Sequence, residues 1–490
     1  MLSCVTSVVL VGVEPRRVNV EVFVGGGQPA FVIVGLPDTA VREATQRVRA
    51  AIQASGYEFP GRRVIVNLAP ADVPKGGSAY DLPIALGVLA ASQATPKGAA
   101  DVVALGELAL DGQVRAVRGG LGAAVVAEET CLRCLLPPES AAEAVSLGRA
   151  QGVVAASSLR EAVEVALGHR SGAAIPELIG DAPPTADLAE VRGQPLVRRA
   201  LEIAATGGHH MLMTGPPGAG KTMLARCLPG ILPRLTGGDV AETALTWAAA
   251  GVPRRDPTLA PFRSPHHSAS LAALIGGGSG IPVPGETALA HKGVLFLDEL
   301  GEFPVHLLDA LRQPMEEGHV VVSRKGASVR FPTEFQLVAA TNPCPCGYEG
   351  DSLRSCQCPP RAIAKYQRRL SGPLVDRFDI AVRVPRVESD EMAGPPGEPS
   401  GQVAARVAAA RKRQDGRGTR NARLGRSELD VLHWHSAAEG MLEQAMRNSA
   451  LTARGWDRVR RVAATIADLD ESDVILSRHL GEALAYRGQR

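Results

Sequence analysis

One stretch constrains the fold of this chain more than any other: "HHMLMTGPPGAGKTMLARCL", residues 209–228. An apolar strand pattern runs into Gly215-x-x-x-x-Gly220-Lys221-Thr222, and a helical pattern follows. In such a loop the backbone N–H groups surround phosphate oxygens, the lysine reaches the β- and γ-phosphates, and the threonine hydroxyl binds Mg²⁺. We therefore expect ATP to be bound by one loop, made of Gly215, Pro216, Pro217, Gly218, Ala219, Gly220, Lys221 and Thr222.

Two later strands end in polar residues of the kind that such a site needs. "KGVLFLDEL" has a buried-strand pattern from Val294 to Leu297 followed by Asp298 and Glu299, and "FQLVAATNP" ends at Asn342. Catalytic groups gather at the carboxyl ends of parallel strands. We expect Asp298 to hold Mg²⁺, Glu299 to polarise the attacking water, and Asn342 to orient that water and sense the γ-phosphate. Taken alone, "LDEL" could be a helix cap, and the asparagine could open a turn.

The whole chain divides into four regions. Residues 1–170 alternate strand and helix patterns in a compact α/β unit, in which Asp38 is placed to cap a helix. Residues 171–187 lie in a Gly- and Pro-rich linker, residues 188–385 follow a βα pattern, and residues 386–490 are mostly helical. The fold class is therefore α/β.

Charge and hydropathy limit the partners. The formal net charge is only +2, so any nucleic-acid site must be a local basic patch. No run of eighteen apolar residues occurs, so we expect no membrane span. The apolar opening lacks a basic leader and a cleavage site, which favours a cytoplasmic protein with reduced thiols.

A basic hairpin is the first candidate for a nucleic-acid contact. "GHVVVSRKGASVRFP" has two alternating runs on either side of "SRKG", which places Arg324 and Lys325 at the tip of a β-hairpin. Two cations at such a tip are placed to contact nucleic-acid phosphates. The alternative is a solvated tip that is basic for solubility.

Four thiols follow the Asn342 strand: Cys344, Cys346, Cys356 and Cys358. Two thiolate pairs bridged by a short loop can supply four sulfurs to one tetrahedral Zn²⁺, and the loop has few apolar residues with which to build a core. A redox switch or unmetallated thiols are the alternatives. We expect His266 and His267, in a loop before the Asp298 strand, to be structural because two adjacent histidines rarely share one metal.

Together, "GPPGAGKT", "SPHHSASLAALIGGG", "PGETALAHKGVLFLDEL", "LRQPMEEG", "AATNPCPCGY", "SGPLVDRFD" and "TARGWDRVRRVAATIADL" resemble the magnesium-chelatase-like AAA+ ATPases of the YifB/ComM type. The resemblance covers nearly the whole chain. It implies a core with a helix-2 insert, a pre-sensor-1 hairpin and the four-cysteine insert, followed by a helical lid. It also implies Mg²⁺-dependent ATP hydrolysis at the subunit interfaces of a ring, expected to be a hexamer.

The same resemblance assigns three residue roles and a substrate. Asn342 becomes sensor 1, Arg377 an arginine finger that acts on the neighbouring subunit, and Arg454 the sensor 2 arginine. Without the resemblance, each arginine would be read as a surface salt bridge. DNA is the implied track, with branch migration of recombination intermediates during natural transformation or general recombination.

The first region carries a resemblance of its own. "LAPADVPKGGSAYDLPIAL" and "LGELALDGQVRAVRGGLGAAVVA" are similar to the Lon-protease (ribosomal S5 domain 2-like) fold. Aligned on Lys75, the catalytic serine position falls on Ala79, next to Ser78, and the catalytic lysine position falls on Gly122. A hydroxyl without an adjacent base is a poor nucleophile, so we expect an assembly or DNA-binding platform without protease chemistry.

Three other functions are compatible with parts of this pattern. A chelatase motor subunit that drives metal insertion into a porphyrin would share the ATPase core but would not need the first region or the cysteine cluster. An ATP-dependent protease would need the missing lysine. A regulator that uses ATP only as a switch would need neither DNA nor a ring.

Overall fold

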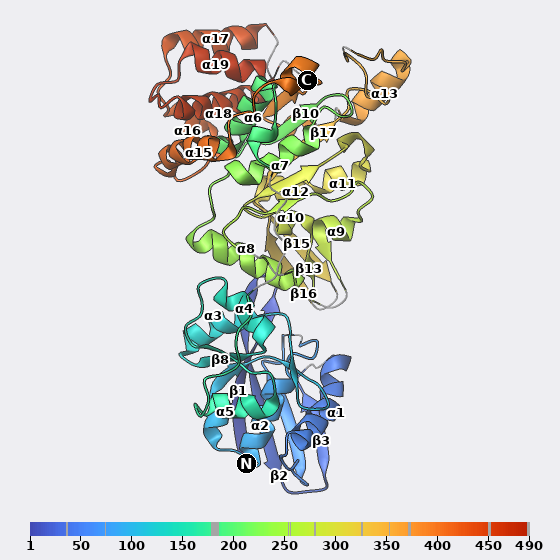
Figure 1. Cartoon of the computed structure of the whole chain (residues 1–490), viewed down its shortest axis with the longest axis vertical. Helices are drawn as coiled ribbons and strands as arrows, with labels where there is room; N and C mark the ends of the chain where they lie inside the picture. The colour runs from blue at the N-terminus through green and yellow to red at the C-terminus, as the bar shows by residue number, and fades with distance from the viewer. Residues whose placement is uncertain are drawn as a thin grey trace.

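The computed structural model describes residues 1–35, 38–73, 75–177, 186–252, 254, 256–278, 281–324, 327–351, 353–370, 374–448 and 452–487. The chain is elongated, with the N-terminal region at one end, the parallel sheet in the middle and the C-terminal helices at the other end (Figure 1). In these described residues, none of the helices combines the length and the apolar character that crossing a bilayer would require.

The N-terminal region is built on a seven-stranded mixed sheet with the order β3-β4-β2-β1-β5-β8-β9. Its strands are β1 (Leu2–Val11), β2 (Glu14–Gly25), β3 (Ala30–Val34), β4 (Arg63–Ala69), β5 (Val102–Ala104), β8 (Arg133–Leu136) and β9 (Val153–Ala155). A separate short pair is formed by β6 (Glu107–Leu108) and β7 (Val114–Arg115). The helices are α1 (Thr39–Ala54), α2 (Asp81–Ala91), α3 (Gly120–Thr130), α4 (Pro138–Val145) and α5 (Leu159–Ala166).

Helix α1 illustrates how the local sequence sets this fold. The Asp38 carboxylate accepts a hydrogen bond from the Val41 N–H (2.8 Å), as expected of an N-cap. Apolar residues then recur at helical spacing, and the face they form is fully buried against the sheet. The predicted cap and helix are confirmed.

The central sheet is fully parallel and has the order β11-β14-β17-β10-β18. Its strands are β10 (Met211–Thr214), β11 (Phe262–Arg263), β14 (Val294–Leu297), β17 (Gln336–Thr341) and β18 (Ile380–Arg383). Helices nearest to it include α6 (Pro195–Gly207), α7 (Lys221–Ile231), α11 (Val305–Ala310) and α12 (Arg312–Glu317). Because the strands are parallel, their carboxyl ends share one edge and their amino ends the opposite edge. We call these the carboxyl edge and the amino edge.

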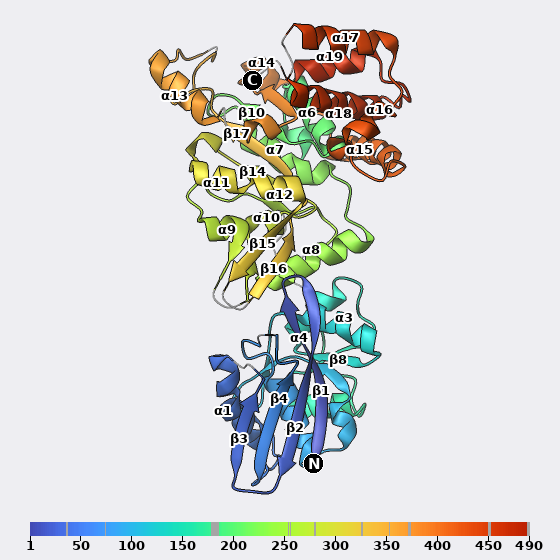
Figure 2. The ribbon, with the colours of Figure 1, turned by 180° about the vertical axis from the view of Figure 1, so that it is seen from behind.

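A smaller layer joins the central sheet to the N-terminal region. It contains α8 (Gly237–Ala250), α9 (Leu271–Ile275), β12 (Gly276–Gly277), β13 (Val283–Pro284), α10 (Glu286–Leu289) and the antiparallel pair β15 (His319–Arg324) and β16 (Ala327–Pro332). The predicted hairpin is therefore present. Figure 2 shows its end next to the tip of the β1–β2 hairpin. At this contact a Cβ on Gly12 would lie 2.4 Å from Val329 Cγ1, and Val11 and Val13 pack against the apolar core of the β15–β16 hairpin.

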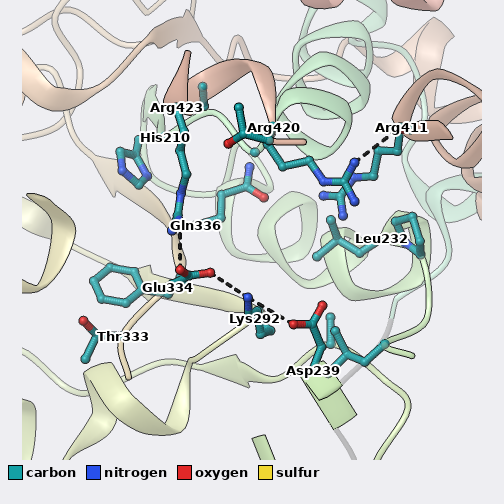
Figure 3. A pocket seen from close by; sticks show the side chains of 18 of the residues that line it. His210, Leu232, Asp239, Lys292, Thr333, Glu334, Gln336, Arg411, Arg420 and Arg423 are labelled. Atoms are coloured by element: carbon teal, nitrogen blue, oxygen red, sulfur yellow. Dashed lines mark hydrogen bonds and ion pairs between the residues drawn. The ribbon is translucent and has the colours of Figure 1, made fainter. Parts of the chain in front are cut away.

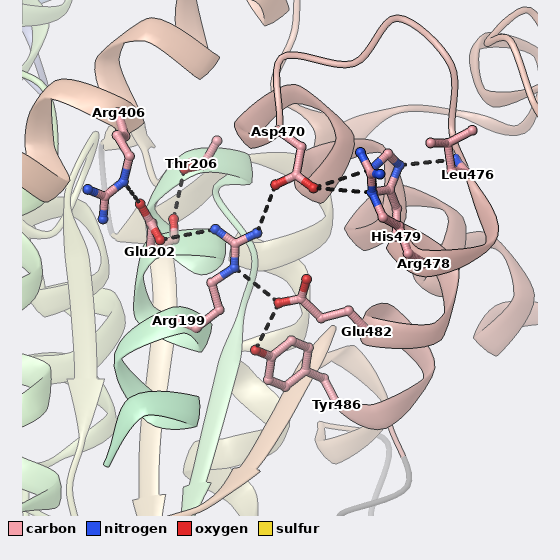
Figure 4. A network of polar contacts seen from close by, with 10 residues as sticks. All are labelled: Arg199, Glu202, Thr206, Arg406, Asp470, Leu476, Arg478, His479, Glu482 and Tyr486. Atoms are coloured by element: carbon pink, nitrogen blue, oxygen red, sulfur yellow. Dashed lines mark hydrogen bonds and ion pairs between the residues drawn. The ribbon is translucent and has the colours of Figure 1, made fainter. Parts of the chain in front are cut away.

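The C-terminal helices lie beside the central sheet (Figure 1). They are α14 (Ser389–Ala393), α15 (Ser400–Asp415), α16 (Arg426–Asp430), α17 (Ser436–Arg447), α18 (Ala453–Leu469) and α19 (Ser477–Ala485). Helix α13 (Pro360–Leu370) lies on the opposite side of the molecule from α15–α19. Helices α15, α18 and α19 share one hydrophobic core with α6, α7 and the sheet. Arg199 of α6 also binds Asp470 (3.3 Å) and Glu482 (3.1 Å), which fastens the last two helices to the core (Figure 4).

Candidate active site

The P-loop lies at the carboxyl edge, between the end of β10 and the start of α7. Gly218 and Gly220 have φ of +80° and +84°, a region that glycine enters without steric cost. Gly215 lies against β18, where a Cβ would be 2.2 Å from the Val384 carbonyl oxygen. The amino end of α7 thus opens directly onto the loop, and its N–H groups and dipole favour an anion there.

Lys221 connects the P-loop to the strand that ends in Asn342. Its Nζ donates to the Pro216 carbonyl (2.9 Å) and to Asn342 Oδ1 (3.2 Å). The residue is only 9% exposed, and desolvation lowers the pKa of its ammonium group. The structure therefore brings together the predicted phosphate-binding lysine and the predicted sensor 1 amide.

Thr222 and Asp298 also meet at this edge. The Thr222 hydroxyl donates to Asp298 Oδ2 (2.7 Å), and the other carboxylate oxygen accepts from the Glu299 N–H (2.9 Å). A hydroxyl and a carboxylate are hard oxygen ligands, so this pair fits Mg²⁺. Glu299 has φ of +52°, and such strain at a non-glycine residue is concentrated at functional sites.

His267 lies beside Glu299, with its Nδ1 3.6 Å from Glu299 Oε2. Its ring centroid lies 4.0 Å from that of His266, with the two rings tilted by 35°, and the ring meets Phe303 edge-on at 6.3 Å. Our expectation of a purely structural histidine pair missed this contact. The paired histidines were visible in the sequence, but nothing in their spacing pointed to the acidic residue thirty-two positions later.

Arg377 and Arg454 lie at the amino edge. They line one pocket of about 240 Å³ together with Arg458 and Arg461. Arg377 forms an ion pair with Glu316, and Arg458 lies 3.6 Å from Asp379.

The sheet fixes the location of this pocket. The Asp379 N–H donates to the His210 carbonyl at the amino end of β10, whereas the P-loop follows its carboxyl end. The fold therefore joins the two predicted arginines to each other and separates both from Lys221 of the same chain. Arg458 and Arg461 were missed, although the i, i+4, i+7 spacing from Arg454 places all three on one helix face.

A larger cavity of about 530 Å³ opens at the same edge (Figure 3). Its lining balances four cations (Lys292, Arg411, Arg420 and Arg423) with four carboxylates (Asp239, Glu334, Asp379 and Asp415). Lys292 binds Glu334 (2.6 Å) and Asp239 (3.1 Å), and Arg423 also binds Glu334 (2.9 Å). The smaller pocket differs because its lining holds four arginines against two carboxylates. The excess positive charge of the amino edge is therefore concentrated around Arg377.

Of the two cations predicted at the hairpin tip, the structure describes only Arg324. Arg324 ends β15 and is exposed. Lys325 lies outside the described residues.

The four cysteines that follow Asn342 form one cluster. All four Sγ atoms lie within 4.8 Å of one another, and Cys344 Sγ is 3.4 Å from Cys346 Sγ and 3.6 Å from Cys356 Sγ. The thiols are free, and the Cys346 N–H points to Cys358 Sγ (3.3 Å). This donor set is compatible with one Zn²⁺.

The Lon-like positions in the N-terminal region do not form a dyad. Lys75 is buried and donates to the Pro70 carbonyl, while the Ser78 hydroxyl contacts Glu107. At Gly122 a Cβ would lie 2.8 Å from Leu10 Cδ2, so the position expected to carry a catalytic lysine is filled by a neighbouring strand.

Three family models of magnesium-chelatase subunits match successive segments of the chain. Residues 187–392 match the family model described as magnesium chelatase, subunit ChlI; residues 20–140 match subunit ChlI of Mg-chelatase; and residues 397–487 match the ChlI C-terminal model. The "Magnesium-chelatase 38 kDa subunit" of Cereibacter sphaeroides is 27% identical over 210 residues, which cover 39% of this chain and 56% of that protein.

Two relatives match over nearly their full length. The chain is 43% identical to "Uncharacterized protein YifB" of Salmonella typhimurium and 41% identical to "Competence protein ComM" of Haemophilus influenzae. Each alignment covers 99% of this chain and 97% of the relative. The chain therefore belongs to the YifB/ComM family of magnesium-chelatase-like AAA+ proteins.

Proposed function

We propose that this protein is an ATP-driven ring motor, expected to be hexameric, that moves DNA strands in recombination intermediates. The observation that carries the proposal is the division of the catalytic groups between the two edges of one sheet. Lys221, Asn342 and Asp298 meet at the carboxyl edge, and the arginines gather at the amino edge. The cofactors are ATP and Mg²⁺, and Zn²⁺ would complete the cysteine cluster.

The residues of the carboxyl edge would bind and activate the nucleotide. The P-loop N–H groups and Lys221 would hold the phosphates, and Thr222 with Asp298 would hold Mg²⁺, which neutralises charge on the β- and γ-phosphate oxygens. Glu299 would accept a proton from the attacking water. Asn342, which already contacts Lys221, would fix that water relative to the γ-phosphate.

The arginines would come from a second copy of the chain. Strand β10 has four residues, so at about 3.3 Å per residue its two ends are roughly 10 Å apart, and Arg377 lies beyond one end while the P-loop lies beyond the other. The lid that carries Arg454 is held against the central sheet in two ways: Arg199 of α6 forms ion pairs with its residues, and the lid helices share one hydrophobic cluster with α6, α7 and the sheet. A head-to-tail contact that brings one amino edge to the next carboxyl edge closes into a ring.

DNA is proposed as the substrate from two lines of support. Arg324 is exposed at the end of the β15–β16 hairpin, where several copies would form a phosphate-binding collar. One full-length relative is named a competence protein, which favours branch migration during DNA uptake or general recombination.

The test is ATP hydrolysis and branch migration on a synthetic four-way junction. We expect DNA to raise ATP hydrolysis, Lys221→Ala to abolish it, and Glu299→Gln to bind ATP but move no junction. Unchanged hydrolysis with any DNA would refute the DNA motor.

The second candidate is a chelatase-type motor subunit, favoured by the partial match to a magnesium-chelatase subunit. It predicts stimulation by a partner chelatase subunit instead of DNA. The same preparation tested for peptide cleavage addresses the protease alternative.

A further inference from the structure

The cysteine cluster lies against the P-loop. Gly347, one residue after Cys346, is buried with φ of +84°, and a Cβ there would be 2.6 Å from Pro217 Cδ and 3.7 Å from Asn342 Cγ. The turn that contains it is closed by a hydrogen bond from the Gly347 N–H to the Cys344 carbonyl (2.9 Å). The turn that follows the first cysteine pair therefore lies against both the phosphate-binding loop and the residue proposed as sensor 1.

We propose that the four cysteines bind one Zn²⁺ and that the metal-bound loop, residues 344–358, acts as a brace that holds the P-loop and Asn342 in their nucleotide-binding arrangement. The inference rests on the ATPase proposal and deepens it, because it makes nucleotide binding dependent on a metal that takes no part in the chemistry.

The sulfur geometry supports a single tetrahedral metal. Four sulfurs at about 2.3 Å from one Zn²⁺ lie about 3.8 Å apart, close to the 3.4–3.6 Å contacts of Cys344 and within the 4.8 Å that spans the set. The N–H of Cys358 points to Cys356 Sγ (3.4 Å), the kind of backbone support that orients metal ligands. A disulfide would need sulfurs about 2.05 Å apart, so the cluster is arranged for a metal.

Apart from the cysteines, the described residues of the loop are held by polar contacts, such as the hydrogen bond from Arg354 to the Tyr348 hydroxyl (3.0 Å), and have no apolar core of their own. Leu353 is 77% exposed, so it adds nothing to a core. A polar contact also ties the loop to the rest of the protein. The Asp351 side chain is 1% exposed and forms an ion pair with Arg386 (2.8 Å), which lies just after β18. A metal would supply the internal cross-link that a short polar loop cannot build from apolar contacts.

The segment that follows the cysteine cluster contacts the carboxyl edge of the central sheet. Helix α13 begins two residues after Cys358, and its Tyr366 hydroxyl lies 3.2 Å from the Thr341 hydroxyl, immediately before Asn342. A Cβ on Gly301, two residues after Glu299, would lie 2.5 Å from the same Tyr366 oxygen. The brace therefore contacts the P-loop through Gly347, and helix α13, which follows it directly, contacts the strand ends that carry Asn342 and Glu299 through Tyr366.

The experiment measures metal content and nucleotide affinity on the full chain without DNA. Zinc is counted by mass spectrometry of the purified protein, and affinity is measured with a fluorescent ATP analogue in Mg²⁺ buffer. We expect about one Zn²⁺ per chain in the wild type and in Cys131→Ser, an exposed thiol outside the cluster. Cys344→Ser with Cys356→Ser should lose the metal and bind the analogue at least tenfold more weakly.

A second pair of variants tests the brace without touching the metal ligands. Gly347→Ala and Gly350→Ala place the same side chain at a positive φ (+84° and +73°), but only the first meets the P-loop; the nearest atom to the second is an Arg383 nitrogen at 3.9 Å. We expect both to keep zinc. Gly347→Ala should weaken ATP binding by about tenfold, and Gly350→Ala should stay within about twofold of the wild type.

The outcomes separate the two proposals. Folded wild type that binds ATP fully but holds no zinc, or equal affinities for the two glycine variants, would overturn the brace and leave the ATPase proposal standing. Wild type that holds zinc but binds no ATP analogue would overturn the ATPase proposal and the brace with it.

Discussion

Replacement of Arg377 by alanine should abolish ATP hydrolysis without weakening ATP binding. The guanidinium lies at the amino edge, roughly 10 Å or more from the P-loop of its own chain through the sheet. It therefore cannot contact the nucleotide bound by that chain. An arginine finger contributes about 10³- to 10⁵-fold to turnover, which corresponds to roughly 4–7 kcal/mol of transition-state stabilisation.

The fold should survive this change. Glu316, which forms an ion pair with Arg377, is 62% exposed and can be solvated after the loss, but the Arg377 side chain is only 16% exposed, so we expect a destabilisation of about 1–2 kcal/mol. Arg377→Lys should be nearly as inactive as alanine, because an ammonium group lacks the planar, bidentate fork. Arg447→Ala, which removes an exposed arginine of α17, is the matched control and should keep full activity.

Phosphate release and binding of a fluorescent ATP analogue give the two readouts, with thermal unfolding as a check on the fold. Turnover within threefold of the wild type would refute the role assigned to Arg377. A loss of ATP binding in proportion to the loss of turnover would place the arginine in its own nucleotide site and refute the division between the two edges.

Three further perturbations test other parts of the account. His267→Ala should lower turnover about tenfold or more while ATP binding is kept, because it removes the ring beside Glu299; a wild-type rate would mean that the contact is incidental. Gly12→Ala places a Cβ 2.4 Å from Val329 Cγ1 and should uncouple the β1–β2 tip from the β15–β16 hairpin, so that DNA stimulation falls while DNA-free hydrolysis stays; equal stimulation would contradict this. Arg324→Ala should weaken DNA binding and make it less dependent on salt, and an unchanged salt slope in a binding titration would argue against a phosphate contact.

The catalytic strands could be predicted because their signal is local. The glycine spacing, the apolar strands and the polar residues at their ends each lie within one short segment, and parallel strands bring their carboxyl ends together whatever the loops do. The contacts of Lys221 with Asn342 and of Thr222 with Asp298 follow from that rule. The α1 cap at Asp38 was equally local.

Contacts between distant segments could not be predicted in the same way. His267 reaches Glu299 because it follows β11, whose carboxyl end lies beside that of β14 in the parallel sheet, and β11 spans only two residues, too few for a strand pattern to reveal it. Likewise, the packing of Leu10 into the space beside Gly122 depends on where the β1–β2 hairpin crosses α3. The sequence indicated that the lysine was missing, but only the fold explains why a lysine would not fit.

The central claim is that each ATP is hydrolysed by residues of two chains, and mixing two inactive variants tests it most directly. Lys221→Ala lacks the nucleotide lysine but keeps Arg377, and Arg377→Ala has the opposite defect. In rings assembled from equal amounts, about a quarter of the interfaces would pair an intact P-loop with an intact arginine. We predict that the mixture regains about a quarter of wild-type ATP hydrolysis, whereas a mixture as inactive as either variant alone, in rings shown to contain both, would contradict the account.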